Sequence, residues 1–205
     1  MHFLMHCRLS IVDLEDKNNK LILCGDYIHG GNDSYGVIEK IMDLKKKYKS
    51  RVIVLIGNHE ESAIDSGAIV DEYCTKEEYN EKRDRKCLDF ISHLDLYYKY
   101  KDEVVFCHAG VDEEAGEYWE AGTADYFYIG KYPAETGEFC TNIVAGHIAA
   151  STVAGNPKHK GIYYDGESHY FIDGGTEKSG YVPVLMYDTL NKKFYEVTER
   201  GNKEL

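Results

Sequence analysis

The sequence predicts an α/β fold with an antiparallel β region at its C-terminal end. Three observations predict it: short apolar runs of strand length, helical spacing of apolar residues between them, and aromatic, strand-like segments after Gly161. The chain has 205 residues, of which 43% are hydrophobic, so it can bury a sizeable core. We expect a single domain over residues 1–205, because this length suits one domain better than two.

Four short apolar runs have the length and the β-branched content of buried strands. They are residues 21–24, 52–56, 104–107 and 143–145. Between the first two runs, apolar residues recur at helical spacing and predict a helix over Ser34–Tyr48, with Ser34 as its N-cap. A second helix is predicted over residues 76–98. Its charges are mixed in sign, which is typical of a solvated helix face rather than of a nucleic-acid-binding patch.

The region after Gly161 has the pattern of antiparallel strands. Four segments are short, aromatic and β-branched, namely residues 162–164, 169–172, 182–187 and 193–197. Turn residues separate them, and the connection between the last two has the length of a hairpin loop. We therefore expect an antiparallel meander appended to the α/β part of the chain.

The charge balance excludes some classes of partner. The chain has 24 basic and 36 acidic residues, for a net charge of −12. Binding to a nucleic acid duplex needs a basic face, and an anionic membrane surface repels an acidic protein, so neither partner is expected. No apolar run approaches the ~20 residues that a membrane-spanning helix needs.

The cysteines and the first residues predict a cytoplasmic location. None of the six cysteines belongs to a Cys-x-x-Cys pair, which disfavours zinc ribbons and thioredoxin-like chemistry. We expect them to be reduced, buried and structural, since a chain of this length does not need disulfides for stability. The N-terminal residues lack the basic and then apolar pattern of a signal peptide.

Polar residues with neighbouring glycines follow each of the four apolar runs. They are Gly25-Asp26, Gly57-Asn58-His59-Glu60, His108-Ala109-Gly110 and Gly146-His147. Ligands of open α/β sheets bind at the carboxyl ends of the strands, so these side chains are expected to converge. A set of carboxylate, amide and imidazole ligands suits Mn, Fe or Zn better than Ca or Mg, and the lack of thiolates argues against a structural zinc site.

In order and spacing, these four blocks resemble those of the calcineurin-like metallophosphoesterases, in particular the phosphoprotein-phosphatase-type branch. That branch includes bacterial serine/threonine phosphatases and symmetrical diadenosine tetraphosphate hydrolases. The resemblance implies a four-layer fold, a β-sandwich flanked by helices, with two divalent metal ions and direct in-line attack by a metal-bound hydroxide. By the same resemblance, Asp26 bridges the two metals, and Asn58, His108 and His147 are further ligands of the second. His59 would give a proton to the leaving group, which makes His59 and Asp26 the expected catalytic residues.

The sequence departs from the family pattern in two places. The opening Gly-Asp-x-His-Gly block, whose Asp and His bind the first metal, is not found, and residues 1–16 resemble the helix that follows it. We therefore expect the N-terminal strand and two ligands of the first metal to be missing, and the activity to be impaired. The family's Gly-Asp-Tyr-Val-Asp-Arg-Gly block has His29 in place of the Asp that orients the catalytic histidine. Gly30 replaces the Arg that binds phosphate.

The leading functional hypothesis is metal-dependent hydrolysis of a phosphoester, with a phosphoprotein as substrate as in serine/threonine phosphatases. One alternative is hydrolysis of a nucleotide phosphoanhydride such as diadenosine tetraphosphate. The other is a catalytically silent binding domain, favoured by the missing first block and by His29 and Gly30. We interpret Glu60 as a carboxylate at a helix N-terminus, where the helix dipole favours it, rather than as a metal ligand.

Overall fold

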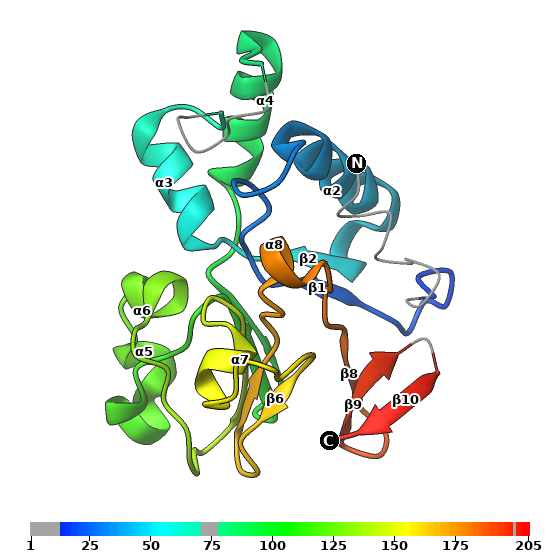
Figure 1. Ribbon diagram of the computed structural model, residues 1–205, viewed down its shortest axis with the longest axis vertical. Coiled ribbons are helices and arrows are strands. Elements are labelled where there is room, and N and C mark those ends of the chain that lie inside the picture. The colour runs from blue at the N-terminus through cyan, green and yellow to red at the C-terminus, as the bar shows by residue number, and fades with distance from the viewer. Residues whose placement is uncertain (1–12, 71–77, 199) are drawn as a thin grey trace.

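The computed structural model describes residues 13–70, 78–198 and 200–205, and it confirms the predicted α/β fold (Figure 1). The described strands form three sheets. Two strands, β1 (Leu21–Leu23) and β2 (Val52–Val54), pair in parallel. Five strands form the largest sheet, in the order β3 (Tyr97–Tyr100), β4 (Val104–Cys107), β5 (Asn142–Ala145), β7 (His169–Phe171) and β6 (Tyr163–Tyr164). Three strands form the last sheet, in the order β10 (Gly201–Glu204), β9 (Lys193–Thr198) and β8 (Leu185–Asp188).

The strands that precede the candidate ligands run in parallel. β4 pairs in parallel with β5, β5 pairs in parallel with β7, and β1 pairs in parallel with β2. A parallel bridge from Leu55 to Asp95 continues beyond β2 toward the start of β3. Because parallel strands end at the same edge of a sheet, the loops after β1 and β2 lie at one edge of their sheet, and those after β4 and β5 lie at one edge of the main sheet. All four predicted strands are confirmed, although β1 is only half-buried.

Two helices pack together beside the β1–β2 sheet (Figure 1). The first is α2 (Ser34–Tyr48), with the predicted bounds, and its Tyr35 and Ile38 share a buried cluster with Cys87 and Ile91 of α4 (Glu81–Ile91). The predicted N-cap is wrong. The carboxylate of Asp33, not the side chain of Ser34, accepts the Gly36 N–H at 2.9 Å, so Ser34 is the first residue inside the helix.

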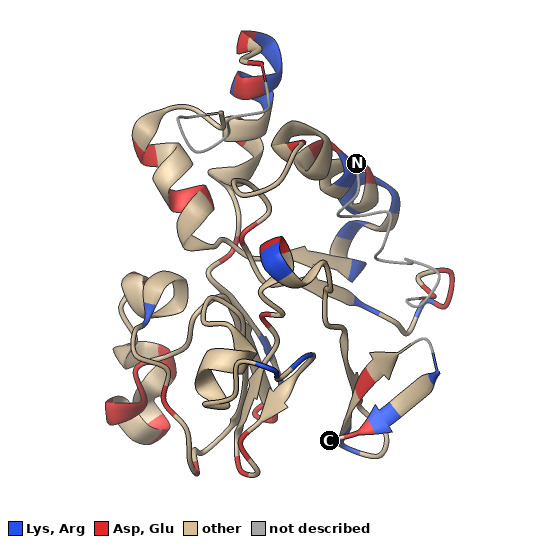
Figure 2. Ribbon diagram, in the orientation of Figure 1, with Lys and Arg blue, Asp and Glu red and all other residues tan. Residues whose placement is uncertain are grey.

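The remaining helical segments are short, apart from α3. They are η2 (Lys49–Arg51), α3 (Asn58–Ser66), η3 (Glu113–Tyr118), α5 (Trp119–Gly122), α6 (Asp125–Gly130), α7 (Ala150–Val153) and α8 (Thr176–Ser179). Figure 2 shows basic and acidic residues side by side on α4, as expected for a solvated helix face. None of the described helices combines the length and the apolar composition that a membrane crossing requires.

The helix predicted over residues 76–98 is too long. Helix α4 begins after Asn80, whose side chain accepts the Arg83 N–H at 3.0 Å, and it ends at Ile91. Tyr97 and Tyr98 lie instead in β3, which pairs antiparallel with β4. Residues 76 and 77 lie outside the described part of the chain, as do residues 1–12 of the expected N-terminal helix. Of its remaining residues, 14 and 15 lie in a turn and 16 in a bend.

The predicted C-terminal meander is correct only for its second half. The hairpin of β8 and β9 is confirmed, and β10 extends it by one strand that the sequence did not predict. The segments at 162–164 and 169–172 form β6 and β7, which belong to the main sheet, where β7 runs parallel to β5. All three residues of β7 are buried, as is typical of a strand inside a sheet that is covered on both faces.

Four of the six cysteines can be compared with the expectation, since Cys7 and Cys74 lie outside the described residues. Cys24, Cys87, Cys107 and Cys140 are free thiols, and Cys87 and Cys107 are buried as expected. Cys24 is half-buried and Cys140 is exposed, so Cys140 does not contribute to a core.

A buried network of charged side chains joins η3 to the start of β7. The Glu113 carboxylate lies 3.1 Å from Nε2 of His169, and Nδ1 of His169 lies 2.8 Å from Oδ2 of Asp165. Glu113 also accepts a hydrogen bond at 2.7 Å from Nζ of Lys131, which pairs in addition with Glu135 at 2.8 Å. Lys131 is only 5% exposed, and its charge is paired with the carboxylates of Glu113 and Glu135 inside the fold.

This network predicts a pH-dependent stability. Burial alone lowers the pKa of His169, but the carboxylates of Glu113 and Asp165 outweigh it and raise that pKa above its ordinary value. A raised folded-state pKa stabilises the fold fully below the unfolded pKa of about 6.5, and the stabilisation is lost as the pH rises through the folded value. His169→Gln should therefore cost more unfolding free energy at about pH 5.5 than at about pH 9 in urea titrations. The exposed His93→Gln is the control, and an equal cost of His169→Gln at both pH values contradicts the prediction.

Candidate metal centre

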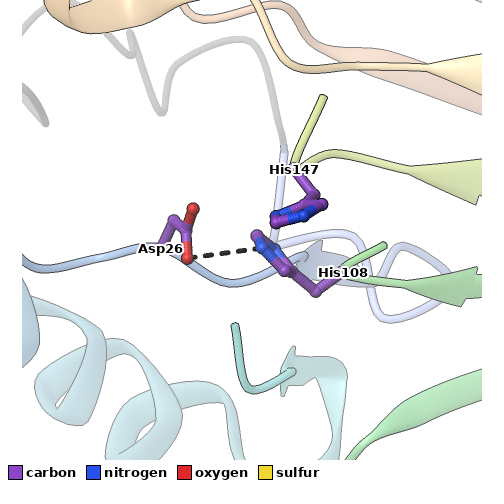
Figure 3. A group of neighbouring side chains, drawn as sticks. All are labelled: Asp26, His108 and His147. Atoms are coloured by element: carbon purple, nitrogen blue, oxygen red, sulfur yellow. Dashed lines mark ion pairs between the residues drawn. The ribbon is translucent and has the colours of Figure 1, made fainter. Parts of the chain in front are cut away.

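The predicted site residues lie together at the carboxyl ends of four strands. Asp26 follows β1, Asn58 and His59 open α3 after β2, His108 directly follows β4, and His147 follows β5. Figure 3 shows the side chains of Asp26, His108 and His147 pointing toward one another. One ligating atom from each of these three residues lies within 4.8 Å of those from the other two.

The side-chain oxygen of Asn58 lies close to a ring nitrogen of each of the two histidines. Its Oδ1 atom lies 2.9 Å from Nε2 of His108 and 3.0 Å from Nδ1 of His147. Oδ1 of Asp26 lies 3.4 Å from Nε2 of His108. All four residues predicted as metal ligands are thus brought together by the fold.

The hydrogen bonds of His108 favour a cation at this point. Its Nδ1 lies 2.7 Å from the carbonyl oxygen of Cys24, which can only accept, so Nδ1 donates and Nε2 is the nitrogen that could offer a lone pair to a metal. Nε2 faces Oδ1 of Asn58 and Oδ1 of Asp26, which are acceptors. A metal ion satisfies such a set of converging lone pairs, and the carboxylate, amide and imidazole donors fit a divalent transition metal.

The surroundings of His147 lower its pKa, which favours metal binding by its imidazole. Burial lowers the pKa of His147, and nearby His108 lowers it further. The ring is therefore held neutral around pH 7, which leaves a lone pair on one nitrogen for a metal.

The Glu60 carboxylate accepts hydrogen bonds from the backbone of the two loops that carry Asp26 and Asn58. It is fully buried in the first turn of α3. Its Oε2 accepts the N–H of Asp26 at 2.8 Å and that of Gly57 at 2.9 Å, and its Oε1 accepts the N–H of Tyr27 at 2.7 Å. Burial, followed by the charge of Asp26, raises the pKa of its carboxyl to about 7. Its place at the helix N-terminus agrees with the interpretation from the sequence, but its three backbone contacts were not foreseen.

The backbone around the site is unusual at several positions. Asp26, His29 and His147 have φ angles of 59°, 66° and 63°, in the left-handed region that residues other than glycine rarely adopt. Gly25 is required by close packing as well as by its φ of 90°, since a Cβ atom there would lie 2.6 Å from Nδ1 of His108.

His59 lies on the open side of the cluster. Its Nε2 is 4.0 Å from Oδ2 of Asp26, and its side chain is 43% exposed, whereas that of His108 is 2% exposed. Its other ring nitrogen, Nδ1, lies 2.8 Å from Nδ1 of His29. His29 stands at the family position whose Asp orients this histidine, and its imidazole contacts His59 although the residue type differs.

The fold and this cluster define an α/β protein with a group of side chains at the ends of its strands that could hold a metal ion. The chain belongs to the calcineurin-like phosphoesterases, whose family model matches residues 7–178. Membership indicates hydrolysis of phosphoesters with the help of divalent metals.

Two solved structures share the fold. One is a protein serine/threonine phosphatase from Saccharomyces cerevisiae with similarity to human phosphatase PP5, at a TM-score of 0.55 and 14% identity over 90% of this chain and 67% of that chain. The other is described as a putative diadenosine tetraphosphatase, at a TM-score of 0.56 and 14% identity over 98% of this chain and 86% of that chain. Their similarity to this chain concerns the fold alone.

Proposed function

We propose that this protein hydrolyses phosphate monoesters of the phosphoserine and phosphothreonine type, with a divalent transition metal bound by Asp26, Asn58, His108 and His147. The observation that supports the proposal is the convergence of these side chains, with Asn58 Oδ1 about equally far from both imidazoles. An exposed histidine directly beside the converging acceptors adds a proton donor that a purely structural metal site does not need.

In this proposal, the metal, the residues that orient its ligands and His59 have separate roles in the reaction. When bound, the metal supplies positive charge that offsets the negative charge developing on the phosphoryl oxygens. The Cys24 carbonyl holds the His108 ring with Nε2 toward the ion, and Glu60 holds the backbone of Asp26. His59 gives the proton on Nε2 to the leaving oxygen, so that the alcohol departs neutral.

A panel of three substrates tests the proposal. A phosphoserine peptide, p-nitrophenyl phosphate and diadenosine tetraphosphate are compared with added Mn²⁺ or Zn²⁺ and after chelation. We expect metal-dependent release of phosphate from the peptide. Faster cleavage of diadenosine tetraphosphate would instead support a nucleotide phosphoanhydride hydrolase. No stoichiometric metal, no rise in Tm on adding Mn²⁺ and no turnover of any substrate would support a silent binding domain.

His59→Ala should slow the phosphoserine peptide by ~10²–10⁴ in kcat, because an alkoxide is a poor leaving group and needs a proton. The nitrophenolate of p-nitrophenyl phosphate leaves without help, so its kcat should fall much less. Steady-state kinetics of both substrates at saturating metal measure the difference. Equal losses would mean that His59 supports the geometry of the site instead of donating a proton.

A further inference from the structure

Helix α8 carries an exposed carboxylate that lies against the loop after β1. A Cβ atom added at Gly30 of this loop would lie 3.7 Å from the carboxyl carbon of Glu177. Gly30 and Glu177 are both exposed, and Gly30 has no side chain that would cover the carboxylate. Within the described part of the chain, Glu177 forms no ion pair, so its charge is available to a molecule that binds beside this loop.

The segment that leads into α8 also contacts the loop after β5. The carbonyl of Asp173 accepts the N–H of Ala150 at 2.8 Å, and Ala150 lies three residues after His147. At its other end, the same segment places Glu177 against the loop that carries Asp26. Residues 173–177 thus connect two of the loops that carry candidate metal ligands, and the Glu177 carboxylate lies at the border of the site.

Two basic side chains of neighbouring segments do not offset the charge of Glu177. Lys178 is the next residue of α8, and consecutive residues of a helix point about 100° apart, so it is directed away from the loop that Glu177 contacts. Arg83 of α4 binds both carboxylate oxygens of Glu39, at 3.2 and 2.9 Å. The negative charge beside the loop after β1 therefore remains.

We propose that Glu177 is a specificity-determining residue, whose carboxylate favours phosphopeptides with Lys or Arg close to the phosphoserine and disfavours those with Asp or Glu there. This inference rests on the proposed function and deepens it by naming the substrate class. Gly30 follows His29, whose ring contacts that of His59, so Glu177 lies within reach of a peptide bound at His59. An extended peptide advances about 3.3 Å per residue, so residues two or three positions from the phosphoserine lie about 7–10 Å from it. These are the residues that we expect Glu177 to attract or repel.

Two phosphoserine peptides that differ only in the charge of their flanking residues test the inference. One has Arg at the second and third positions on either side of the phosphoserine, and the other has Glu there. Because exposed charge pairs are weak, Glu177→Gln should lower kcat/KM for the basic peptide about 2–5-fold and raise it for the acidic peptide by a similar factor. Glu177→Lys should change both values in the same directions, by about 5–25-fold.

The matched control is Glu138→Gln, which makes the same change in net charge at an exposed carboxylate. Glu138 precedes β5, whereas the candidate ligand His147 follows that strand, so the control lies at the opposite edge of the sheet. Raising the salt concentration from about 0.1 M to about 1 M shortens the screening length from about 10 Å to about 3 Å, and should reduce the preference of the wild type for the basic peptide. Equal preferences in Glu177→Gln and Glu138→Gln, or a loss on both peptides in Glu177→Gln, overturn the inference.

Binding of the two peptides keeps the inference testable if the proposed hydrolysis fails. Isothermal titration of the zinc-loaded protein gives the ratio of their Kd values, and Glu177→Gln should reduce the preference for the basic peptide while Glu138→Gln does not. This result without turnover refutes the proposed function but supports the inference. Turnover with the wild-type preference retained in Glu177→Gln refutes the inference and leaves the proposed function standing. Neither binding nor turnover of either peptide overturns both.

Discussion

Replacing Glu60 by alanine should lower the free energy of unfolding by about 2–5 kcal/mol. The substitution leaves the N–H groups of Asp26, Tyr27 and Gly57 without their acceptor. The Gly57 bond is buried and the other two are partly buried, and an unpaired buried group costs about 1–3 kcal/mol. Since the stability of a typical domain is only about 5–15 kcal/mol, this loss is a large part of it. Urea denaturation followed by circular dichroism measures it.

Two further variants make the Glu60 experiment specific. Glu61→Ala changes the next residue of α3, which is exposed, and should cost less than about 1 kcal/mol. Glu60→Gln keeps the size of the side chain but has only one acceptor oxygen, so its loss should lie between those of Glu60→Ala and Glu61→Ala. If Glu60→Ala is as stable as Glu61→Ala, the carboxylate does not hold the two loops together.

The second large effect is expected at the metal centre. His147→Asn should weaken Zn²⁺ binding by about 10²-fold or more, because even side chains that only support a ligand contribute about 10–100-fold to metal affinity. Asparagine tolerates the left-handed backbone at this position, so the fold should persist. Phosphatase activity should be lost together with the metal.

Isothermal titration with Zn²⁺ measures the affinity, and the rise in Tm on adding Zn²⁺ gives a second measure. His93→Asn removes an exposed histidine and should bind the metal as the wild type does. Wild-type affinity in His147→Asn would exclude His147 as a ligand and would count against the site.

Strands could be predicted from the sequence where a short run consists of apolar residues alone. The runs that became β2, β4 and β5 are apolar throughout, and no pairing partner was needed to recognise them. Strand β3 was missed because Tyr97 and Tyr98 also continue the apolar stripe of the preceding helix. Their pairing with β4 and the stacking of Tyr97 on Tyr128, with centroids 4.7 Å apart, depend on residues distant in the sequence.

The ligand set could be predicted because each ligand follows a strand, and parallel strands bring their ends together. The backbone contacts of Glu60 could not be predicted, and for His29 only its family position pointed toward His59. Glu60 reaches Asp26 across 34 residues, and His29 meets His59 across 30 residues, through a loop whose path depends on left-handed residues. The N-cap of α2 was misplaced by one residue for a simpler reason, since Asp33 and Ser34 are both good capping residues.

The left-handed backbone at Asp26, His29 and His147 limits how these positions can change over evolutionary time. Few side chains other than glycine, asparagine and aspartate tolerate this conformation, so each position is constrained by the backbone as well as by its chemistry. Lys49, Lys101 and Lys192 adopt the same conformation, so the backbone sets a preference and not an absolute rule. In a descendant that no longer needed the metal, we expect asparagine, aspartate or glycine to be favoured at these three positions, while the surrounding strands vary as ordinary core.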